Sequence, residues 1–342
     1  MQSATASQAA SSKAFTFFDP DLYRQAVRAV EAEIVVAGKG TFKSNLIRAD
    51  FRRLWMQRGN DNLPKVIWGA IPHARAPIQF LTRNDQPSVS LCGTELLPGN
   101  LVVFGRGASF HEHTAGSMHW GSMSLTPQDL AAAGRDIVGH DLAPPAATHQ
   151  LHPPAALMAR LAELHECAGH MAQSTPETLA HPEVSRALEQ KLLHAMIRCL
   201  ADDIPAKRSP CNLRHTAIIA QFEEFLMANY ARPLYLAEIC TALGTTERTL
   251  RTCCQERLGV GPMRYLWLRR MNLARRALAG ATPSATNVTK IATAHGFWEL
   301  GRFSVAYRAL FGEPPSAALQ RGPAGRPVMQ QHPFDFAAAR AA

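Results

Sequence analysis

The chain has 342 residues, which is enough for two domains with full hydrophobic cores. Its composition is that of a globular protein, and the sequence lacks the uninterrupted apolar run of about 18 residues that predicts a membrane-spanning helix. The net charge of +9 is unevenly placed: residues 1–204 hold 18 Lys and Arg against 19 Asp and Glu, whereas residues 205–342 hold 18 against 8. This asymmetry favours a polyanionic partner for the C-terminal part alone.

Residues 1–14 are rich in Ser and Ala, and they lack the basic start and apolar centre of a signal peptide. We therefore expect a disordered lead and a cytoplasmic protein. The following pattern, over residues 19–33, predicts a helix with Asp19 as its N-cap. Short runs of β-branched and aromatic residues, separated by turn signals, then extend over residues 33–125. They predict an all-β sandwich or barrel.

Two amphipathic helices are predicted after the strands. Apolar residues recur at steps of three and four over residues 157–171, and at steps of four over residues 184–200. The first helix has a 3.5-residue apolar seam, so this segment could form a dimer contact or pack on the β domain. Residues 205–212 contain two prolines and predict an interdomain linker. The tail, residues 322–342, is expected to be disordered.

The basic part of the chain contains a duplicated pattern. Residues 239–259, ICTALGTTERTLRTCCQERLG, align with residues 291–312, IATAHGFWELGRFSVAYRALFG, when Gly244 is placed over Gly296. Past the glycine the second copy is one residue longer. Each copy predicts a short helix, a glycine turn, and a second helix that ends at a further glycine. The duplicated unit is therefore a helix-turn-helix.

The second helix of a helix-turn-helix has a free outer face that can enter a DNA major groove. Residues 262–280, between the two copies, predict a connecting helix with one apolar side and several arginines. Two motifs on one connecting helix could read successive major grooves, roughly 34 Å apart. The candidate DNA-binding residues are Arg248, Thr249, Arg251, Thr252, Arg269, Arg270, Glu299, Leu300, Gly301, Arg302, Val305 and Arg308.

Residues 213–321 resemble the DNA-binding domain of the AraC/XylS family of bacterial transcription regulators. The blocks that carry the resemblance are LAEICTALGTTERTLRTCCQERLGVGPMRYL, RRMNLARRAL and VTKIATAHGFWELGRFSVAYRALFGEPP. The resemblance implies a double helix-turn-helix on double-stranded promoter DNA, RNA polymerase as a partner, and regulation, often activation, rather than enzymatic activity. FDPDLYRQAV and LLPGNLVVF are similar to the N-terminal domain of the same family. That similarity implies a cupin-like domain that binds a small effector or mediates homodimer formation.

Several positions differ from the family pattern. Thr252 stands where the family often has arginine, and both Leu300 and Val305 stand where it is often polar. The second recognition helix is therefore expected to contact mainly phosphates. Arg248 and Arg251 are expected to read bases, because arginine pairs well with guanine O6 and N7.

Aromatic and histidine side chains of the N-terminal part are candidates for an effector site, although the aromatic residues could equally belong to the core. These candidates are Trp55, Trp68, Phe80, His111, His113 and Trp120. His111 and His113 alternate, as metal ligands on a strand would, but the carboxylate expected four or five residues on is missing. We therefore predict no metal and no other cofactor. A metal-dependent cupin enzyme fused to a DNA-binding domain is the alternative, and a general DNA-coating protein is a third hypothesis.

The sequence thus predicts an α+β protein in which a cupin-like β-barrel or sandwich precedes an all-α domain. The expected segments are a disordered lead (1–14), a cupin-like sensor domain (15–150), a helical dimerisation or packing segment (151–204), a linker (205–212), the double helix-turn-helix domain (213–321) and a disordered tail (322–342).

Overall fold

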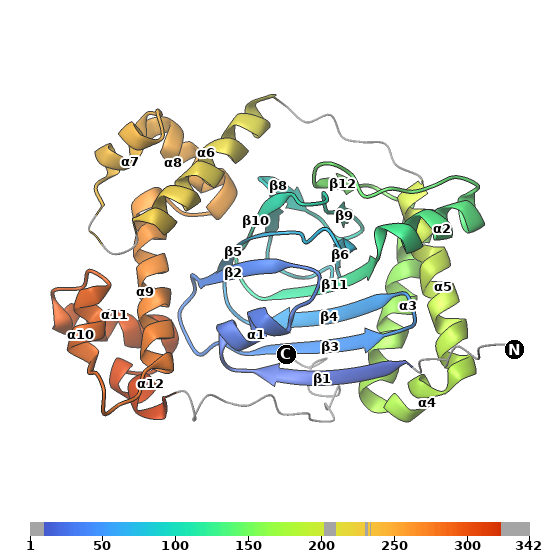
Figure 1. The fold of residues 1–342 in the computed structure, drawn as a ribbon, viewed down its shortest axis with the longest axis horizontal. Helices are drawn as coiled ribbons and strands as arrows, with labels where there is room; N and C mark the ends of the chain where they lie inside the picture. The colour runs from blue at the N-terminus through green and yellow to red at the C-terminus, as the bar shows by residue number, and fades with distance from the viewer. Residues whose placement is uncertain (1–9, 202–209, 230–231, 233, 323–342) are drawn as a thin grey trace, which may run out of the picture.

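The computed structural model describes residues 10–201, 210–229, 232 and 234–322. The remaining residues, which include most of the predicted lead, most of the linker and nearly all of the predicted tail, lie outside the described part. An α+β architecture is confirmed, with a β-rich N-terminal part followed by helices (Figure 1). None of the described helices is both long and apolar enough to cross a membrane.

Two antiparallel sheets form the N-terminal domain. The larger sheet has the order β1 (Ser11–Phe17), β3 (Ser44–Asp50), β4 (Trp55–Asp61), β11 (Met118–Leu125), β6 (Ala76–Leu81), β9 (Leu101–Val103) and β12 (His149–Leu151). The smaller sheet has the order β2 (Glu31–Val36), β5 (Lys65–Ala70), β10 (Ser109–Thr114), β7 (Val89–Leu91) and β8 (Thr94–Leu96). Side chains such as Phe17, Leu46 and Phe110 are buried in one core cluster. The predicted sandwich or barrel is therefore present.

The N-terminal boundary of this domain was predicted wrongly. Residues 11–14 belong to strand β1, which pairs with β3 so that Ser11 lies opposite Asp50. Phe15 and Phe17 alternate on this strand and are 5% and 0% exposed, so burial of their rings stabilises a strand with little sequence signal of its own.

The helix predicted over residues 19–33 is shorter than expected, because α1 spans Pro20–Ala26. Asp19 is its N-cap as predicted, and its carboxylate accepts hydrogen bonds from the backbone N–H groups of Asp21 and Leu22. Ala29 has a φ of 61°, in the left-handed region, which ends any helical continuation. The last three residues of the predicted helix, 31–33, belong to β2 instead.

Helices α2 (Pro127–Val138), α3 (Ala155–Ser174), α4 (Pro176–Ala180) and α5 (Pro182–Ala201) build a second core with the larger sheet. The two predicted amphipathic helices are α3 and α5. Their apolar faces are used within the chain, since Leu161 and Leu192 are 0% exposed. Glu189 of α5 also accepts hydrogen bonds from the backbone N–H groups of Arg53 and Leu54 in the β3–β4 turn. These contacts favour packing as the role of the segment.

The C-terminal domain consists of α6 (Pro210–Ala228), α7 (Leu236–Ala242), α8 (Glu247–Leu258), α9 (Pro262–Gly280), α10 (Val288–Ala294), α11 (Leu300–Phe311) and α12 (Pro315–Arg321). Gly244 and Gly296 adopt φ values of 59° and 80°, as the predicted tight turns require. Gly259 and Gly312 end α8 and α11 in the left-handed conformation. Both predicted helix-turn-helix motifs are therefore present.

Candidate nucleic-acid interface and ligand cavity

The first helix-turn-helix pairs α7 with α8. Thr246 caps α8, because its hydroxyl accepts a hydrogen bond of 3.2 Å from the backbone N–H of Thr249. The inner face of α8 buries Leu250, Cys253 and Cys254 completely. Its outer face presents the exposed candidates Arg248, Arg251 and Thr252 to solvent, with Thr249 half-buried.

The second motif pairs α10 with α11 and has an aromatic interior. Phe303, Tyr307 and Phe311 follow one another along the inner face of α11, with ring centroids 5.6 Å and 4.7 Å apart. The candidate Leu300 is half-buried and packs against this core. The remaining candidates of this motif are exposed, namely Glu299, Gly301, Arg302, Val305 and Arg308.

Helix α9 joins the two motifs. Figure 1 shows α7 and α8 near one end of α9, and α10 and α11 near its other end. The exposed residues of α8 and α11 thus belong to two separate outer faces on one connecting helix. This is the arrangement that the duplicated pattern predicts.

The side chains of Arg269 and Arg270 on α9 form contacts within the protein, although the sequence suggests that they face DNA. Arg269 donates a hydrogen bond of 2.8 Å to the carboxylate of Glu223, and this pair is mostly buried. Tyr265 donates to the other oxygen of the same carboxylate. Arg270 donates to the backbone carbonyl of Arg232 at 2.7 Å, and partial burial lowers the pKa of its guanidinium. We therefore leave Arg269 out of the proposed DNA-contacting residues, because its charge is paired inside the protein.

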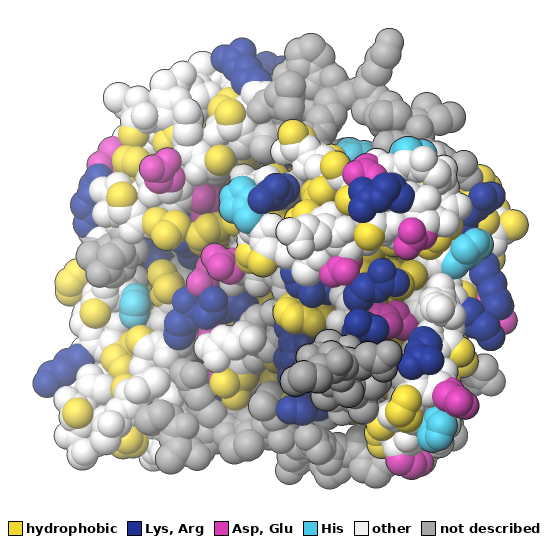
Figure 2. Space-filling view, turned by 45° about the vertical axis from the view of Figure 1, so that its right-hand side comes forward, with side chains coloured by type: hydrophobic (Ala, Val, Ile, Leu, Met, Phe, Trp, Pro, Cys, Tyr) yellow, Lys and Arg dark blue, Asp and Glu magenta, His cyan; other side chains and the backbone are white. Residues whose placement is uncertain are grey.

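Two further arginines of α9 connect the domains. Arg275 is paired with Asp19 and Asp21, and Arg276 is paired with Asp21 and with Glu33 of β2. Both oxygens of the buried Asp21 carboxylate are used, one by each arginine. On the face shown in Figure 2, basic and acidic side chains likewise lie close together instead of forming one basic field. The positive excess of the C-terminal part is thus partly neutralised within the chain.

The backbone of β2 is held by the same helix. Asn272 of α9 accepts a hydrogen bond of 3.1 Å from the N–H of Val36 and donates one of 3.0 Å to its carbonyl. A side-chain amide thereby satisfies one residue of a sheet edge. The interface between the domains therefore combines ion pairs with directional hydrogen bonds.

The terminal glycine of each helix-turn-helix also touches the N-terminal domain. A Cβ at Gly259 would lie 2.7 Å from the ring of His113, and one at Gly312 would lie 2.6 Å from the hydroxyl of Thr41. Near the second contact, the N–H of Gly40 donates to the carbonyl of Leu310 at 3.1 Å. Both recognition helices therefore end against the same β domain.

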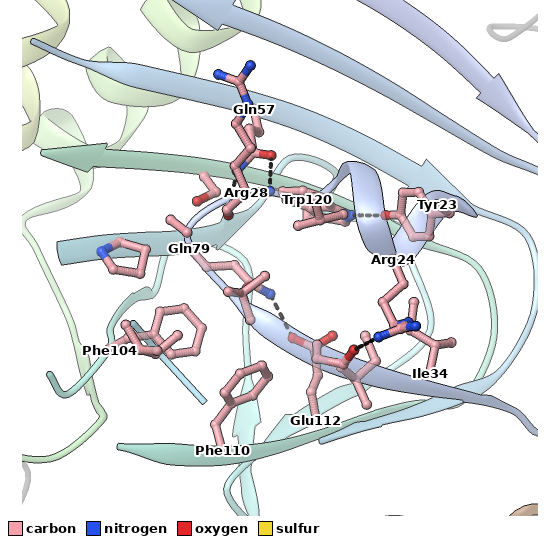
Figure 3. A pocket seen from close by; sticks show the side chains of 18 of the residues that line it. Tyr23, Arg24, Arg28, Ile34, Gln57, Gln79, Phe104, Phe110, Glu112 and Trp120 are labelled. Carbon is pink, nitrogen blue, oxygen red and sulfur yellow. Dashed lines mark hydrogen bonds between the residues drawn. The ribbon is translucent and has the colours of Figure 1, made fainter. Parts of the chain in front are cut away.

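A cavity of about 80 Å³ lies in the N-terminal domain, with α1, β2 and both sheets in its wall (Figure 3). Phe104 and Phe110 form an apolar side, with ring centroids 5.3 Å apart. On another side, Trp120 donates a hydrogen bond of 2.9 Å to the hydroxyl of Tyr23 on α1. The cavity is large enough for a small molecule fragment and is mainly apolar.

One acidic group lies within this apolar wall. Glu112 is 3% exposed and accepts a hydrogen bond of 2.7 Å from the amide of Gln79. Burial raises the pKa of Glu112, and the nearby Lys65 opposes this shift. Lys65 itself is paired with the buried Asp61 at 2.7 Å. The cavity thus offers a carboxyl group and an amide to a ligand.

The six effector candidates do not form one site. Trp120 lines the cavity, whereas Trp68 lies on the opposite face of the smaller sheet, beside Arg269. Trp55 stacks against the guanidinium of Arg75 at 3.9 Å. Phe80 is 0% exposed and packs against the ring of His165 in the second core. The sequence missed Glu112 and Gln79, since polar residues inside a β-rich segment gave no periodic signal, and it missed Tyr23, which lies outside that segment on α1.

His111 and His113 also point away from the cavity, toward α8. His111 is 4% exposed, and burial together with the positive charge of Arg257 lowers its pKa to about 4. His113 lies against Gly259. Among the described residues, no three His, Cys, Asp or Glu side chains are grouped as metal ligands would be. The alternative of a metal-dependent cupin enzyme gains no support from this arrangement.

Comparisons with known proteins agree with the two-motif geometry. Residues 239–321 match a family of helix-turn-helix domains. Over 150 residues, 44% of this chain, the sequence is 34% identical to the probable thc operon regulatory protein of Rhodococcus erythropolis, of which it covers 45%. It is 27% identical over 142 residues to the XylDLEGF operon transcriptional activator 2 of Pseudomonas putida, which spans 42% of this chain and 86% of the activator.

A solved structure of a probable AraC family transcriptional regulator from Rhodopseudomonas palustris CGA009 is 35% identical. That similarity covers 32% of this chain and 99% of the other, with a TM-score of 0.28. The C-terminal part of the chain is a helix-turn-helix domain of the AraC/XylS type. The match extends over less than half of the Rhodococcus relative, so the effector and target genes of this AraC/XylS protein do not follow from it.

Arg251 and Arg269 should behave differently when each is replaced by alanine. Arg251 is exposed on the outer face of α8, so Arg251→Ala should weaken binding to a specific site by about 1–3 kcal/mol without changing stability. Arg269→Ala leaves the Glu223 carboxylate buried without its charge partner, and should lower the free energy of unfolding by about 3–5 kcal/mol. Urea unfolding and a DNA titration measure the two effects. Equal stability of the two variants would contradict the assignment.

Glu112→Gln should make the protein more stable at neutral pH. The pKa of Glu112 is raised in the folded state, so the folded protein holds the proton of Glu112 more tightly than the unfolded chain does. The contribution of Glu112 to the free energy of unfolding is therefore fully present below the unfolded-state pKa and is lost as the pH rises through the folded-state pKa. Glutamine keeps the shape and has no charge to bury. The stability difference between variant and wild type, measured by urea unfolding, should therefore grow from acid toward neutral pH. A constant difference across this range would be incompatible with a raised pKa.

Proposed function

We propose that this protein is a sequence-specific transcription regulator that reads two successive major grooves of promoter DNA through α8 and α11. The observation that carries the proposal is the presence of two helix-turn-helix motifs on one connecting helix, each with an exposed outer face. The DNA-contacting set consists of the exposed candidates of α8 and α11, together with Glu299 before α11 and the half-buried Thr249 on the outer face of α8. It includes Arg248, Thr249, Arg251, Thr252, Glu299, Gly301, Arg302, Val305 and Arg308.

The N-terminal domain is proposed as the regulatory part, and its cavity as the effector site. A mainly apolar wall with Glu112 and Gln79 on one side suits a small, largely apolar molecule that carries a hydrogen-bond donor. This revises the effector candidates to residues such as Tyr23, Glu112 and Trp120. We propose activation of transcription, with RNA polymerase as a partner; the first part of this proposal is supported by similarity to a protein named as a transcriptional activator.

The contacts between the domains support a specific regulatory mechanism. Tyr23 and Arg24 of α1 line the cavity, while Asp21 of the same short helix binds Arg275 and Arg276 of α9. A ligand that displaces α1 would therefore also disturb the contact that holds the connecting helix. A ligand shifts this equilibrium only by the difference in its affinity for the two arrangements.

Both outer faces remain accessible while the domains are in contact, so the contact does not cover the DNA-binding residues. Instead, the β domain holds the end of α8 at Gly259 and the end of α11 at Gly312. We propose that this arrangement fixes the distance and rotation between the two motifs. The N-terminal domain would thereby select DNA in which the two target boxes have one spacing.

Selection of the purified protein against random duplex DNA at near-physiological salt tests the proposed function. Two short boxes about one helical turn apart would support a double reader. One box alone would mean that only one motif reads bases. A bound pool without enrichment, with and without candidate effectors, would overturn sequence-specific regulation and favour a DNA-coating protein, whose affinity falls steeply with salt.

Asp21→Ala should relax the spacing requirement. The substitution removes the carboxylate shared by Arg275 and Arg276 and leaves both recognition helices unchanged. Wild-type protein should lose about tenfold in affinity, or 1.4 kcal/mol, when one base pair is inserted between the selected boxes. The Asp21→Ala variant should lose clearly less affinity when the same base pair is inserted.

Glu95→Ala is the matched control for Asp21→Ala. It also removes one carboxylate from the N-terminal domain, but Glu95 is exposed, on the same sheet as Glu33. Its sensitivity to spacing should equal that of the wild type. If Asp21→Ala retains the full penalty for the inserted base pair, the N-terminal domain does not set the spacing.

A further inference from the structure

The most exposed large hydrophobic side chains among the described residues lie in the helix-turn-helix motifs. Tyr235, Trp298 and Val305 are 73%, 72% and 73% exposed. Tyr235 precedes α7 and Trp298 precedes α11, whereas Val305 lies in the middle of α11. An apolar side chain therefore occupies the centre of an outer face that the fold leaves open.

Folding of the second motif does not account for Val305. The inner face of α11 is filled by Phe303, Tyr307 and Phe311, and Phe297 packs against Phe303 with a centroid distance of 4.9 Å. Valine is β-branched and has a lower helix propensity than many polar residues. The position gains nothing from burial, so a contact outside the chain is the better explanation.

The surroundings of Val305 indicate what it contacts. Arg302 and Arg308 are exposed on the same helix, three residues before and after it, and place guanidinium groups on both sides, with Arg302 also paired to the exposed Glu299 at 2.8 Å. A Cβ added at Gly301, one turn earlier, would meet nothing within 4 Å. The outer face therefore combines an apolar centre, open space for close approach and flanking cations, which is complementary to a groove bordered by phosphates.

We propose that Val305 contacts the C5-methyl group of thymine in the major groove and makes the second motif selective for A·T pairs. This inference rests on the proposed DNA-reading function. The thymine methyl is the apolar feature that base edges present in the major groove, and valine has no donor or acceptor for the polar features. In the aligned first motif, Thr252 occupies the corresponding position beside Arg248 and Arg251. The two boxes should therefore differ, with guanine read by α8 and thymine by α11.

A double-mutant cycle between protein and DNA tests the contact. The protein change is Val305→Ala, and the DNA change replaces each thymine of the second box, one at a time, by deoxyuridine, which lacks only the methyl group. For one thymine, the replacement should weaken binding of the wild type by about three- to fivefold, the effect of one buried methyl group. The same replacement should have a clearly smaller effect on Val305→Ala, because the two Cγ methyl groups of valine are gone and only the Cβ of alanine remains to contact the thymine methyl.

Val305 is largely exposed, so the melting temperature of the variant should match that of the wild type. Leu97→Ala removes a half-exposed apolar side chain from the N-terminal domain and is the matched control, with the full effect of deoxyuridine retained. A second box without a methyl-dependent thymine, or equal deoxyuridine effects in wild type and Val305→Ala, would overturn the inference while leaving DNA reading intact. Failure to enrich any box would overturn the proposed function itself.

Discussion

The buried ionic contact between α9 and the start of the N-terminal domain is the interaction on which the arrangement of this protein depends. Asp19 uses one carboxylate oxygen to cap α1 and the other to bind Arg275. The same residue therefore determines both a local helix and the position of a distant domain. Removal of one partner from a buried ion pair leaves an uncompensated charge, which is strongly unfavourable. Loss of either Asp19 or Arg275 would therefore weaken the contact between the domains strongly.

Duplication explains why the two DNA-reading motifs share a scaffold and differ in chemistry. Their turns need a left-handed residue, so Gly244 and Gly296 are equivalent and fixed by backbone geometry. Positions on their outer faces that are exposed in the described part of the chain, such as Thr252 and Val305, have no packing constraint there and are free to diverge. A protein built in this way can acquire a composite target sequence while the fold remains the same.

Features that depend on local geometry could be predicted from the sequence, and features that depend on distant partners could not. The Asp19 cap and the glycine turns follow from neighbouring residues. Arg251 and Arg269 look alike in sequence, yet only Arg269 meets the buried carboxylate of Glu223, 46 residues earlier. Trp120 lines the cavity, whereas Trp68 faces away from it, because strand pairing and pleat decide the side of a sheet.

The same dependence on distant partners suggests why α1 is so short. Asp21 and Tyr23 are two positions apart on this seven-residue helix and therefore lie on nearly opposite faces, so that Asp21 meets the arginines of α9 while Tyr23 accepts a hydrogen bond from Trp120 at the cavity wall. A longer helix would be anchored by further core contacts and would move less readily. Because α1 has few residues and two buried polar contacts, the proposed mechanism needs only a small movement of this one element. That property is what a link between an effector cavity and a pair of DNA-reading motifs requires.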